Sequence, residues 1–513
     1  MKTHFAAKNA IATAVDSSGK ISRVEKPLGL NIDAAGDRAC TNCHDPHKSS
    51  RFAPLPEISS SALENIEKSF ALSSHADYDS PSWNHTNFAA SDRRCMPCHN
   101  AVESVKFMEQ VQYVWDYKTG PFKSIQPSAT NGLGGAPLGC GSCHDLDDTE
   151  NISIEGVSGI NVIKGSLRAA DGNHADGEFY LPIAQELFNS LTSLSLPDKV
   201  LIKQKADNSL LCFTCHAGRT NIFIKNEDFS AQFYGASTHY APSAANAAGL
   251  LLPKIKDAAY SALISDNLKP RADFNDSSTW SAHGGNVDFS GEKFPKCAAC
   301  HDINRNGHSL AAYKDASGAP LIIKDRSDID SIRYINVAGS ACSSCHGANG
   351  EAGAPISETI AAAKGFSDLL DFYGEALKIT QVNLRYSQDN HRFEFWNGSA
   401  WAETTSSSWN LDNKGLKKFA AQLTYDALIH DRGGYAHLGK EQLRQAVGES
   451  LAFIYQSKTN NSGDAAGFKS WLKSGGDPLI DGSGALQGAQ SAGVELLCPS
   501  DDCDYDSWKS AVW

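Results

Sequence analysis

Six segments of the form Cys-x-x-Cys-His carry the clearest chemical signal in this 513-residue chain. They read CTNCH, CMPCH, CGSCH, CFTCH, CAACH and CSSCH, and they begin at Cys40, Cys95, Cys140, Cys212, Cys297 and Cys342. With 14 cysteines and 17 histidines in the whole chain, chance would produce far fewer than one such segment. A disulfide, a zinc site and a redox dithiol all use paired cysteines, but none of them requires a histidine directly after the second cysteine.

Covalent attachment of c-type haem is the chemistry that this spacing favours. The two cysteines bond the porphyrin and the adjacent histidine binds its iron. A structural zinc takes four ligands, usually from two paired knuckles, and iron–sulfur clusters need sets of four cysteines. We therefore expect six c-type haems, attached at Cys40, Cys43, Cys95, Cys98, Cys140, Cys143, Cys212, Cys215, Cys297, Cys300, Cys342 and Cys345. The proximal iron ligands would be His44, His99, His144, His216, His301 and His346.

Each iron has a sixth coordination position, which the composition assigns to histidine. The chain has three methionines, one terminal and one inside a motif, whereas eleven histidines remain beyond the six in the motifs. We expect bis-histidine ligation throughout, which leaves no vacant position for a substrate. The candidate distal ligands are His47, His75, His85, His239, His283, His308 and His437. For His174, His391 and His430, a solvated or core role is equally consistent with the sequence. His4 could bind an iron of a neighbouring subunit.

The fold class predicted is that of a multihaem cytochrome c, with mostly irregular loops, scattered short α-helices and little β-structure wrapped around six haems. The segments between motifs are long, polar and without a fixed period, so the porphyrins would supply the apolar core. We expect two parts: residues 1–355, which carry the six motifs, and residues 356–513, which are haem-free and mainly helical and cap the last haem.

Several elements can be placed in the second part. Residues 356–378 read as a helix, and residues 380–402 contain an alternating segment that predicts a hairpin turned at Asn397-Gly398. Two apolar stripes with helical spacing follow, formed by Leu416, Phe419, Ala420, Leu423 and Ala427, and by Leu443, Val447, Leu451 and Ile454. Core packing explains both stripes. His437 would lie in the turn between them and cap the last haem, with His430 as the competing residue.

Composition and termini limit the compartments and partners. The formal net charge of −13 argues against a nucleic-acid or acidic-membrane partner, and no apolar run approaches the length of a membrane helix. The first fifteen residues have no apolar core of the signal-peptide type, so we expect a chain numbered without its signal or already mature. Cys498 and Cys503, the two cysteines outside the motifs, predict a disulfide formed in an oxidising compartment; free thiols are the alternative.

The chain resembles the large multihaem c-type cytochromes of metal-reducing and related bacteria. The resemblance is carried by CTNCHDPH at 40–47, SSHAD followed by WNH and CMPCH, CFTCHAGR at 212–219, THYAPSAANAAG at 238–249 and GGYAH at 433–437. It implies distal ligation by His75, His85, His239 and His437. One departure concerns the fifth motif, where the CHxPH usual in the family is replaced by CHDINRNGH, so that the distal candidate His308 lies seven residues beyond His301.

The resemblance implies electron transfer rather than catalysis. Some hexahaem relatives polymerise into extracellular filaments (cytochrome nanowires), while others associate with an outer-membrane porin or shuttle electrons in the periplasm. We expect an exported protein, extracellular or on the outer cell surface, that self-associates into a filament or acts as a surface cytochrome with redox partner proteins and extracellular electron acceptors. The alternatives are a monomeric periplasmic electron shuttle and a multihaem reductase with one open haem site. No CxxCK, the variant found in many such reductases, occurs in the chain.

Overall fold

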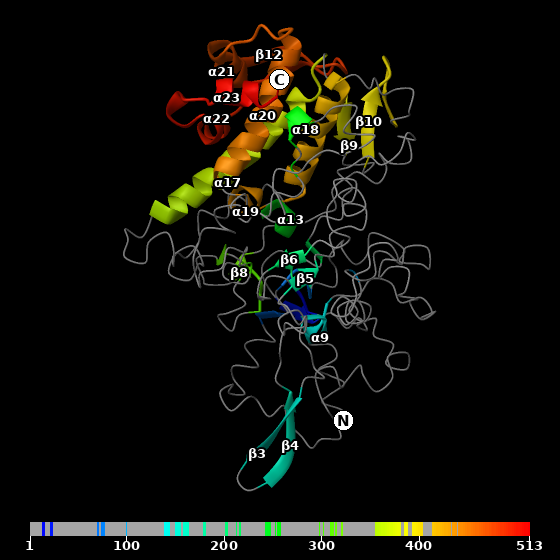
Figure 1. The fold of residues 1–513 in the computed structure, drawn as a ribbon, viewed down its shortest axis with the longest axis vertical. Coiled ribbons are helices and arrows are strands. Elements are labelled where there is room, and N and C mark those ends of the chain that lie inside the picture. Colours follow the sequence, from blue (N-terminus) through cyan, green and yellow to red (C-terminus); the bar gives the residue numbers. More distant parts are fainter. Residues whose placement is uncertain are drawn as a thin grey trace.

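The computed structural model describes residues 13–15, 21–23, 69–70, 73–76, 99, 138–143, 149–154, 157–163, 178–180, 201–203, 212, 215–216, 242–247, 252, 254–257, 297, 301, 308–311, 313–314, 320–321, 354–380, 384–387, 392–403, 413–431, 433–438 and 440–512. The elements of the C-terminal part gather at one end of the molecule, and shorter elements lie toward the other end (Figure 1).

The C-terminal part is built mainly from helices, with a small sheet and a strand pair inserted between them. Its three long helices are α17 (Ala354–Ala376), α18 (Asn413–Ile429) and α20 (Lys440–Lys458), with the single turn α19 (Gly434–His437) between the last two. Helix α17 lies within two residues of the helix that the sequence predicts at 356–378. The chain ends with α21 (Ala465–Ser474), α22 (Ser491–Leu497), the 3₁₀ turn η8 (Pro499–Asp501) and α23 (Tyr505–Ser510).

The apolar stripes of the sequence face the core between these helices. On α18 the fully buried members are Phe419, Ala420, Leu423 and Ala427, and on α20 they are Leu443, Val447, Leu451 and Ile454. Helix α17 contributes Leu369, Tyr373 and Ala376 to the same core. Burial of one side of each helix is what a 3.6-residue period produces, and it fixes how α17, α18 and α20 pack.

Aromatic side chains join the last helices to α20. Phe468 stacks on Tyr505 with ring centroids 4.7 Å apart, and Tyr455 of α20 lies 5.5 Å from Trp471. Trp508 of α23 is buried and lies directly over Gly448, where α20 carries no side chain. Offset and edge-to-face pairs of this kind add to the stability that burial provides. The C-terminal segment is therefore part of the same core as α20.

A three-stranded antiparallel sheet follows α17. Its strands are β9 (Leu384–Ser387), β10 (Arg392–Trp396) and β11 (Trp401–Glu403), in the order β11-β10-β9. The turn between β10 and β11 lies at Asn397 and Gly398, as the sequence predicts. Gly398 has a φ of +98°, which favours glycine, and the Asn397 side chain accepts a 2.9 Å hydrogen bond from the Ala400 amide. The sequence did not indicate β9 separately.

A strand pair and a disulfide complete the C-terminal part. Strands β12 (Gly475–Pro478) and β13 (Ala485–Gln487) form an antiparallel pair after α21. Cys498 and Cys503 form a disulfide that spans η8, the bond that the sequence predicts.

The described elements before α17 are short. Four antiparallel strand pairs are β1 with β2 (Thr13–Val15, Ile21–Arg23), β3 with β4 (Thr149–Ile154, Val157–Ile163), β5 with β6 (Glu178–Tyr180, Leu201–Lys203) and β7 with β8 (Tyr313–Lys314, Pro320–Leu321). The helical elements are α9 (Cys140–Cys143), α13 (Ser243–Ala247) and the 3₁₀ turn η2 (Ile255–Asp257). Of these, α13 packs against α19 and η2 against α18, which connects the two parts of the chain.

Among the described helices, none has a stretch that is both long and apolar enough to span a membrane.

The close packing of Trp508 on α20 gives a test of the core. An exposed helical Gly→Ala change stabilises by roughly 1 kcal/mol. At Gly448 the new methyl group would overlap the Trp508 ring, so we expect Gly448→Ala to destabilise by about 1–3 kcal/mol. Hydrogen–deuterium exchange of the α20 and α23 amides measures this loss. Ser470→Ala, at an exposed position of α21, is the control and should leave protection unchanged; greater protection in Gly448→Ala would contradict the packing.

Candidate functional site

The described Cys-x-x-Cys-His motifs adopt helical turns. In the fifth motif the His301 amide donates a 2.9 Å hydrogen bond to the Cys297 carbonyl, the i to i−4 bond of an α-helix. In the third motif α9 runs from Cys140 to Cys143, and in the fourth Cys212, Cys215 and His216 are helical. Residues i and i+4 share one face of a helix. The turn therefore places the first cysteine and the histidine of a motif on the same side.

Three motifs that are far apart in the sequence meet around one thiol. Cys212 of the fourth motif is hydrogen-bonded to Cys297 of the fifth, and it also lies within electrostatic range of Cys143 of the third and of Cys215. The hydrogen bond with Cys297 and burial raise the pKa of Cys212. None of these four described cysteines forms a disulfide. Cysteines of the third, fourth and fifth motifs are therefore neighbours.

A first pair of imidazoles joins a motif histidine to a distant histidine. The rings of His75 and His216 have centroids 5.8 Å apart and an interplanar angle of 73°. His75 lies on a turn at 73–76, and its carbonyl accepts a 2.9 Å hydrogen bond from the Leu138 amide, just before the third motif. Burial, together with the nearby rings of His216 and His301, lowers the pKa of His75 to about 3. His75 is therefore uncharged at neutral pH, the form in which imidazole binds a metal.

A second pair brings the C-terminal part to the fifth motif. The rings of His301 and His437 have centroids 6.1 Å apart and an interplanar angle of 28°. Burial is the main cause that lowers the pKa of His301 to about 4, and the charge of His437 adds to it. We expected His437 to cap the last haem, which would belong to the sixth motif. The structure places it beside the fifth-motif histidine. The sixth motif lies outside the described residues, so capping of the last haem stays a prediction.

Both rings of this second pair are oriented through Nδ1. Nδ1 of His301 lies 2.8 Å from the carbonyl oxygen of Leu310, and Nδ1 of His437 lies 2.7 Å from Oδ1 of Asp431. Carbonyl and carboxylate oxygens only accept, so each Nδ1 carries a proton, and in the neutral ring Nε2 is the nitrogen with the lone pair. Metal-binding histidines are held in this way, with the second nitrogen hydrogen-bonded to an oxygen. Leu310 adopts a positive φ of 57°, which is unusual for leucine.

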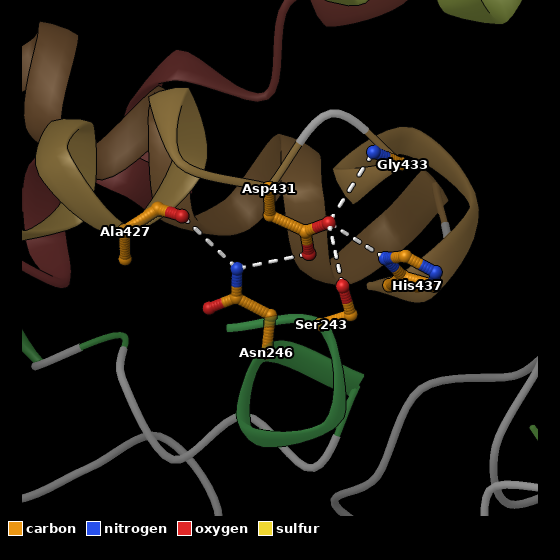
Figure 2. Close-up of polar contacts among 6 residues, drawn as sticks. All are labelled: Ser243, Asn246, Ala427, Asp431, Gly433 and His437. Carbon is orange, nitrogen blue, oxygen red and sulfur yellow. Dashed lines mark hydrogen bonds and ion pairs between the residues drawn. The ribbon is translucent and has the colours of Figure 1, made fainter. Parts of the chain in front are cut away.

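Asp431 is the centre of the polar contacts behind His437 (Figure 2). Its Oδ1 accepts hydrogen bonds from His437, from the Gly433 amide at 3.2 Å and from the Ser243 hydroxyl at 3.3 Å. Its Oδ2 accepts from Asn246 Nδ2 at 3.0 Å. Burial acts to raise the pKa of Asp431, but the charge of His437 and the hydrogen bonds to the carboxylate outweigh it and lower the pKa.

The charge of Asp431 acts in turn on His437. Burial acts to lower the pKa of His437, but the charge of Asp431 and its hydrogen bond raise it above the usual value. Asn246 uses the same amide nitrogen to reach the Ala427 carbonyl at 3.1 Å, so α13 holds both the carboxylate and the end of α18.

The separations of the two ring pairs are compatible with two imidazoles bound to one metal ion. Metal–imidazole nitrogen bonds are about 2 Å long, so two imidazoles that bind one ion from opposite sides have ring centroids roughly 6 Å apart. The two observed separations, 5.8 Å and 6.1 Å, lie close to this value. Each pair contains one motif histidine, whose cysteines would tether the porphyrin. Among the described residues, no group of three or more His, Cys, Asp or Glu side chains is placed to hold a metal ion.

The structure brings together four of the histidines predicted as ligands, namely His75, His216, His301 and His437. His99 of the second motif is buried, and His308 lies two residues before Leu310 in the segment that orients His301. His430, the competitor of His437, lies in the helical part with Nδ1 3.3 Å from Asp426. Outside the described residues lie His4, His44, His47, His85, His144, His174, His239, His283, His346, His391, Cys40, Cys43, Cys95, Cys98, Cys300, Cys342 and Cys345.

Sequence reasoning missed the residues behind His437. Asp431 stands six residues before it in DRGGYAH, and Ser243 and Asn246 lie in the segment THYAPSAANAAG, which we singled out only for its resemblance. An acidic residue shortly before a candidate ligand was a usable signal, because ligating histidines are commonly supported by carboxylates. The two residues of α13 gave no such signal, since only the fold brings them to Asp431.

Comparisons of the chain with protein-family models, with curated proteins and with solved structures find no match.

The contacts of Asn246 predict how firmly α13 is attached. Removing its amide in Asn246→Ala would leave a buried carbonyl and a buried carboxylate oxygen each short of one donor, at a cost of about 1–3 kcal/mol. We expect faster hydrogen–deuterium exchange in α13 and at the end of α18. Asn397→Ala, in the exposed β10–β11 turn, is the control and should affect that turn alone. Unchanged exchange in α13 would show that these contacts do not hold it.

Proposed function

We propose that this protein transfers electrons through six covalently bound c-type haems, each ligated by two histidines. The observation that carries the proposal is the approach of His75 to His216 and of His301 to His437. In both pairs the motif histidine predicted as a proximal ligand lies beside a histidine predicted independently as a distal ligand. The six motifs themselves supply the attachment chemistry.

The described side chains have the properties that such ligation requires. Low pKa values keep His75 and His301 neutral, and hydrogen bonds through Nδ1 fix the tautomers of His301 and His437 so that Nε2 can bind iron. When bound, a haem iron takes up and releases single electrons. Two imidazoles per iron leave no position for a substrate, so the residues favour electron transfer over bond chemistry.

The proximity of the two pairs supports passage of electrons between centres. His301 contributes electrostatically to the pKa of His75, and His216 to that of His301, so the two pairs lie close together. The side chains of Cys212 and Cys297 are also neighbours. The fourth and fifth motifs would therefore hold neighbouring centres, with the third motif next to them.

For the physiological role we propose an exported protein, extracellular or on the cell surface, that acts as a filament subunit or a surface cytochrome with redox partner proteins and extracellular electron acceptors. The resemblance of the motif segments to the multihaem cytochromes of metal-reducing bacteria supports this role. Export also agrees with the Cys498–Cys503 disulfide, which forms in oxidising compartments. His4 would bind an iron of the adjacent subunit.

Removal of a distal ligand tests the pairing. The wild-type protein should contain six haems per chain by iron and haemochrome analysis and, when reduced, should bind no carbon monoxide. His437→Ala and His75→Ala should each keep six haems and each bind one carbon monoxide per chain, because one iron of six loses an axial imidazole. His430→Gln tests whether His430 rather than His437 is the ligand, and we expect this variant to bind no carbon monoxide.

The outcomes distinguish the alternatives. A colourless protein, or zinc in place of iron, would refute the haem proposal. Carbon monoxide binding by the reduced wild type at one site per chain would favour a reductase with an open iron. If His437→Ala bound no carbon monoxide and His430→Gln bound one per chain, the ligand would be His430.

Assembly is tested separately by negative-stain electron microscopy of the secreted, haem-loaded protein. We expect filaments of constant width, and we expect His4→Ala to shorten or abolish them while retaining six haems. Monodisperse particles for the wild type would favour a surface cytochrome or a periplasmic shuttle.

A further inference from the structure

We infer that Asp431 is a positioning residue that fixes the orientation of His437 and makes the reduction potential of the iron bound by His437 more negative. The inference rests on the proposed function, since it concerns the centre that His301 and His437 would share. It adds a residue that belongs to none of the predicted haem attachment points or iron ligands.

The geometry shows that Asp431 controls the His437 ring. The hydrogen bond from Nδ1 is the shortest of the four that the carboxylate accepts, at 2.7 Å, and Asp431 is almost completely buried. The ring lies over Gly433, in the space that a side chain there would fill, since a Cβ at Gly433 would lie 2.6 Å from its Cε1 atom. Rotation of the ring about its bonds would break the hydrogen bond to Asp431. Its Nε2 is therefore held in one direction.

Asp431 itself cannot move to follow a rotating ring. Asn246 of α13 holds Oδ2 and also binds the Ala427 carbonyl of α18, while the Gly433 amide and the Ser243 hydroxyl hold Oδ1 (Figure 2). These three donors are neutral, so they satisfy the carboxylate without cancelling its charge. The carboxylate is anchored by two segments far apart in the sequence.

The two axial ligands of this centre thus differ in their supporting groups. His301 donates to a neutral backbone carbonyl, whereas His437 donates to a carboxylate. A carboxylate partner makes an imidazole a stronger electron donor, and a fixed negative charge favours the ferric state over the ferrous state. Both effects make the reduction potential more negative. Asp431 would therefore set the fifth centre apart from a centre whose ligands both donate to neutral groups.

The experiment compares two substitutions at Asp431 in the full-length, haem-loaded chain. Asp431→Asn keeps the shape and the oxygen acceptor but removes the charge, and Asp431→Ala removes the acceptor as well. Asp426→Asn is the matched control, because Asp426 is also a buried aspartate of the same helical part and lies beside His430 rather than a proposed ligand. Spectroelectrochemical titration gives the six potentials. The centre concerned is the one whose axial-ligand NMR signals are lost in His437→Ala.

In Asp431→Asn we expect six haems, unchanged low-spin spectra, and one centre of six that titrates at a more positive potential. In Asp431→Ala we expect the same shift, together with carbon monoxide binding at up to one site per chain, because the unanchored ring releases the iron part of the time. Asp426→Asn should leave all six potentials unchanged. A purely structural role of Asp431 would change stability without moving one potential selectively.

The failures can be told apart. Six haems and six unchanged potentials in Asp431→Asn would overturn the inference and leave the proposed function standing, even if Asp431→Ala fails to fold. Equal shifts in Asp431→Asn and Asp426→Asn would also overturn it, since any buried charge would then have the same effect. A wild type that binds no haem would overturn both proposals.

Discussion

The approach of the His301 ring to the His437 ring, with centroids 6.1 Å apart, is the arrangement on which the candidate site depends. His301 belongs to the helical turn of the fifth motif, and His437 belongs to the one-turn helix α19 between α18 and α20. Their environment is costly for a protein without a ligand, because burial keeps His301 uncharged and a polar ring away from water must find partners. Each ring has one hydrogen-bond partner, which it reaches through Nδ1. A metal ion bound by Nε2 of both rings would give the second nitrogen a partner as well and would cross-link the two segments.

The C-terminal helices supply a rigid support for that contact. Helix α19 packs through Tyr435 near Phe366 of α17, with ring centroids 6.0 Å apart, and Gly434 is buried directly against the Phe366 ring. A methyl group at Gly434 would lie 2.8 Å from that ring, so only glycine allows the turn to approach α17 this closely. The aromatic cluster of α20, α21 and α23 stabilises the same core from the far side. A region without any Cys-x-x-Cys-His motif can therefore determine the position of His437, a candidate iron ligand.

Much of this organisation could be predicted from the sequence, since it is encoded locally. The helical stripes, the turn at Asn397-Gly398 and the Cys498–Cys503 bridge all depend on residues within a few positions of one another. The pairing of His437 could not be predicted in the same way. The sequence placed it in the turn between two helical stripes, but only the fold, with α13 packed against α19, shows that this turn lies beside the fifth motif. Asp431 was missed for the same reason, since two of its donors come from α13.

The arrangement around Cys212 suggests how chain order relates to the order of centres in space. Cys143, Cys212 and Cys297 belong to three consecutive motifs, and the Cys212 side chain lies near both of the others although long segments separate them in the sequence. His75, which precedes all three motifs, lies beside the fourth-motif histidine, and its carbonyl is bonded to Leu138 just before the third. These three consecutive motifs are thus neighbours in space, while the second histidine of each pair comes from a distant segment. Each ligand pair would then cross-link two segments, and loss of one distal histidine would loosen the fold at the place where it opens an iron.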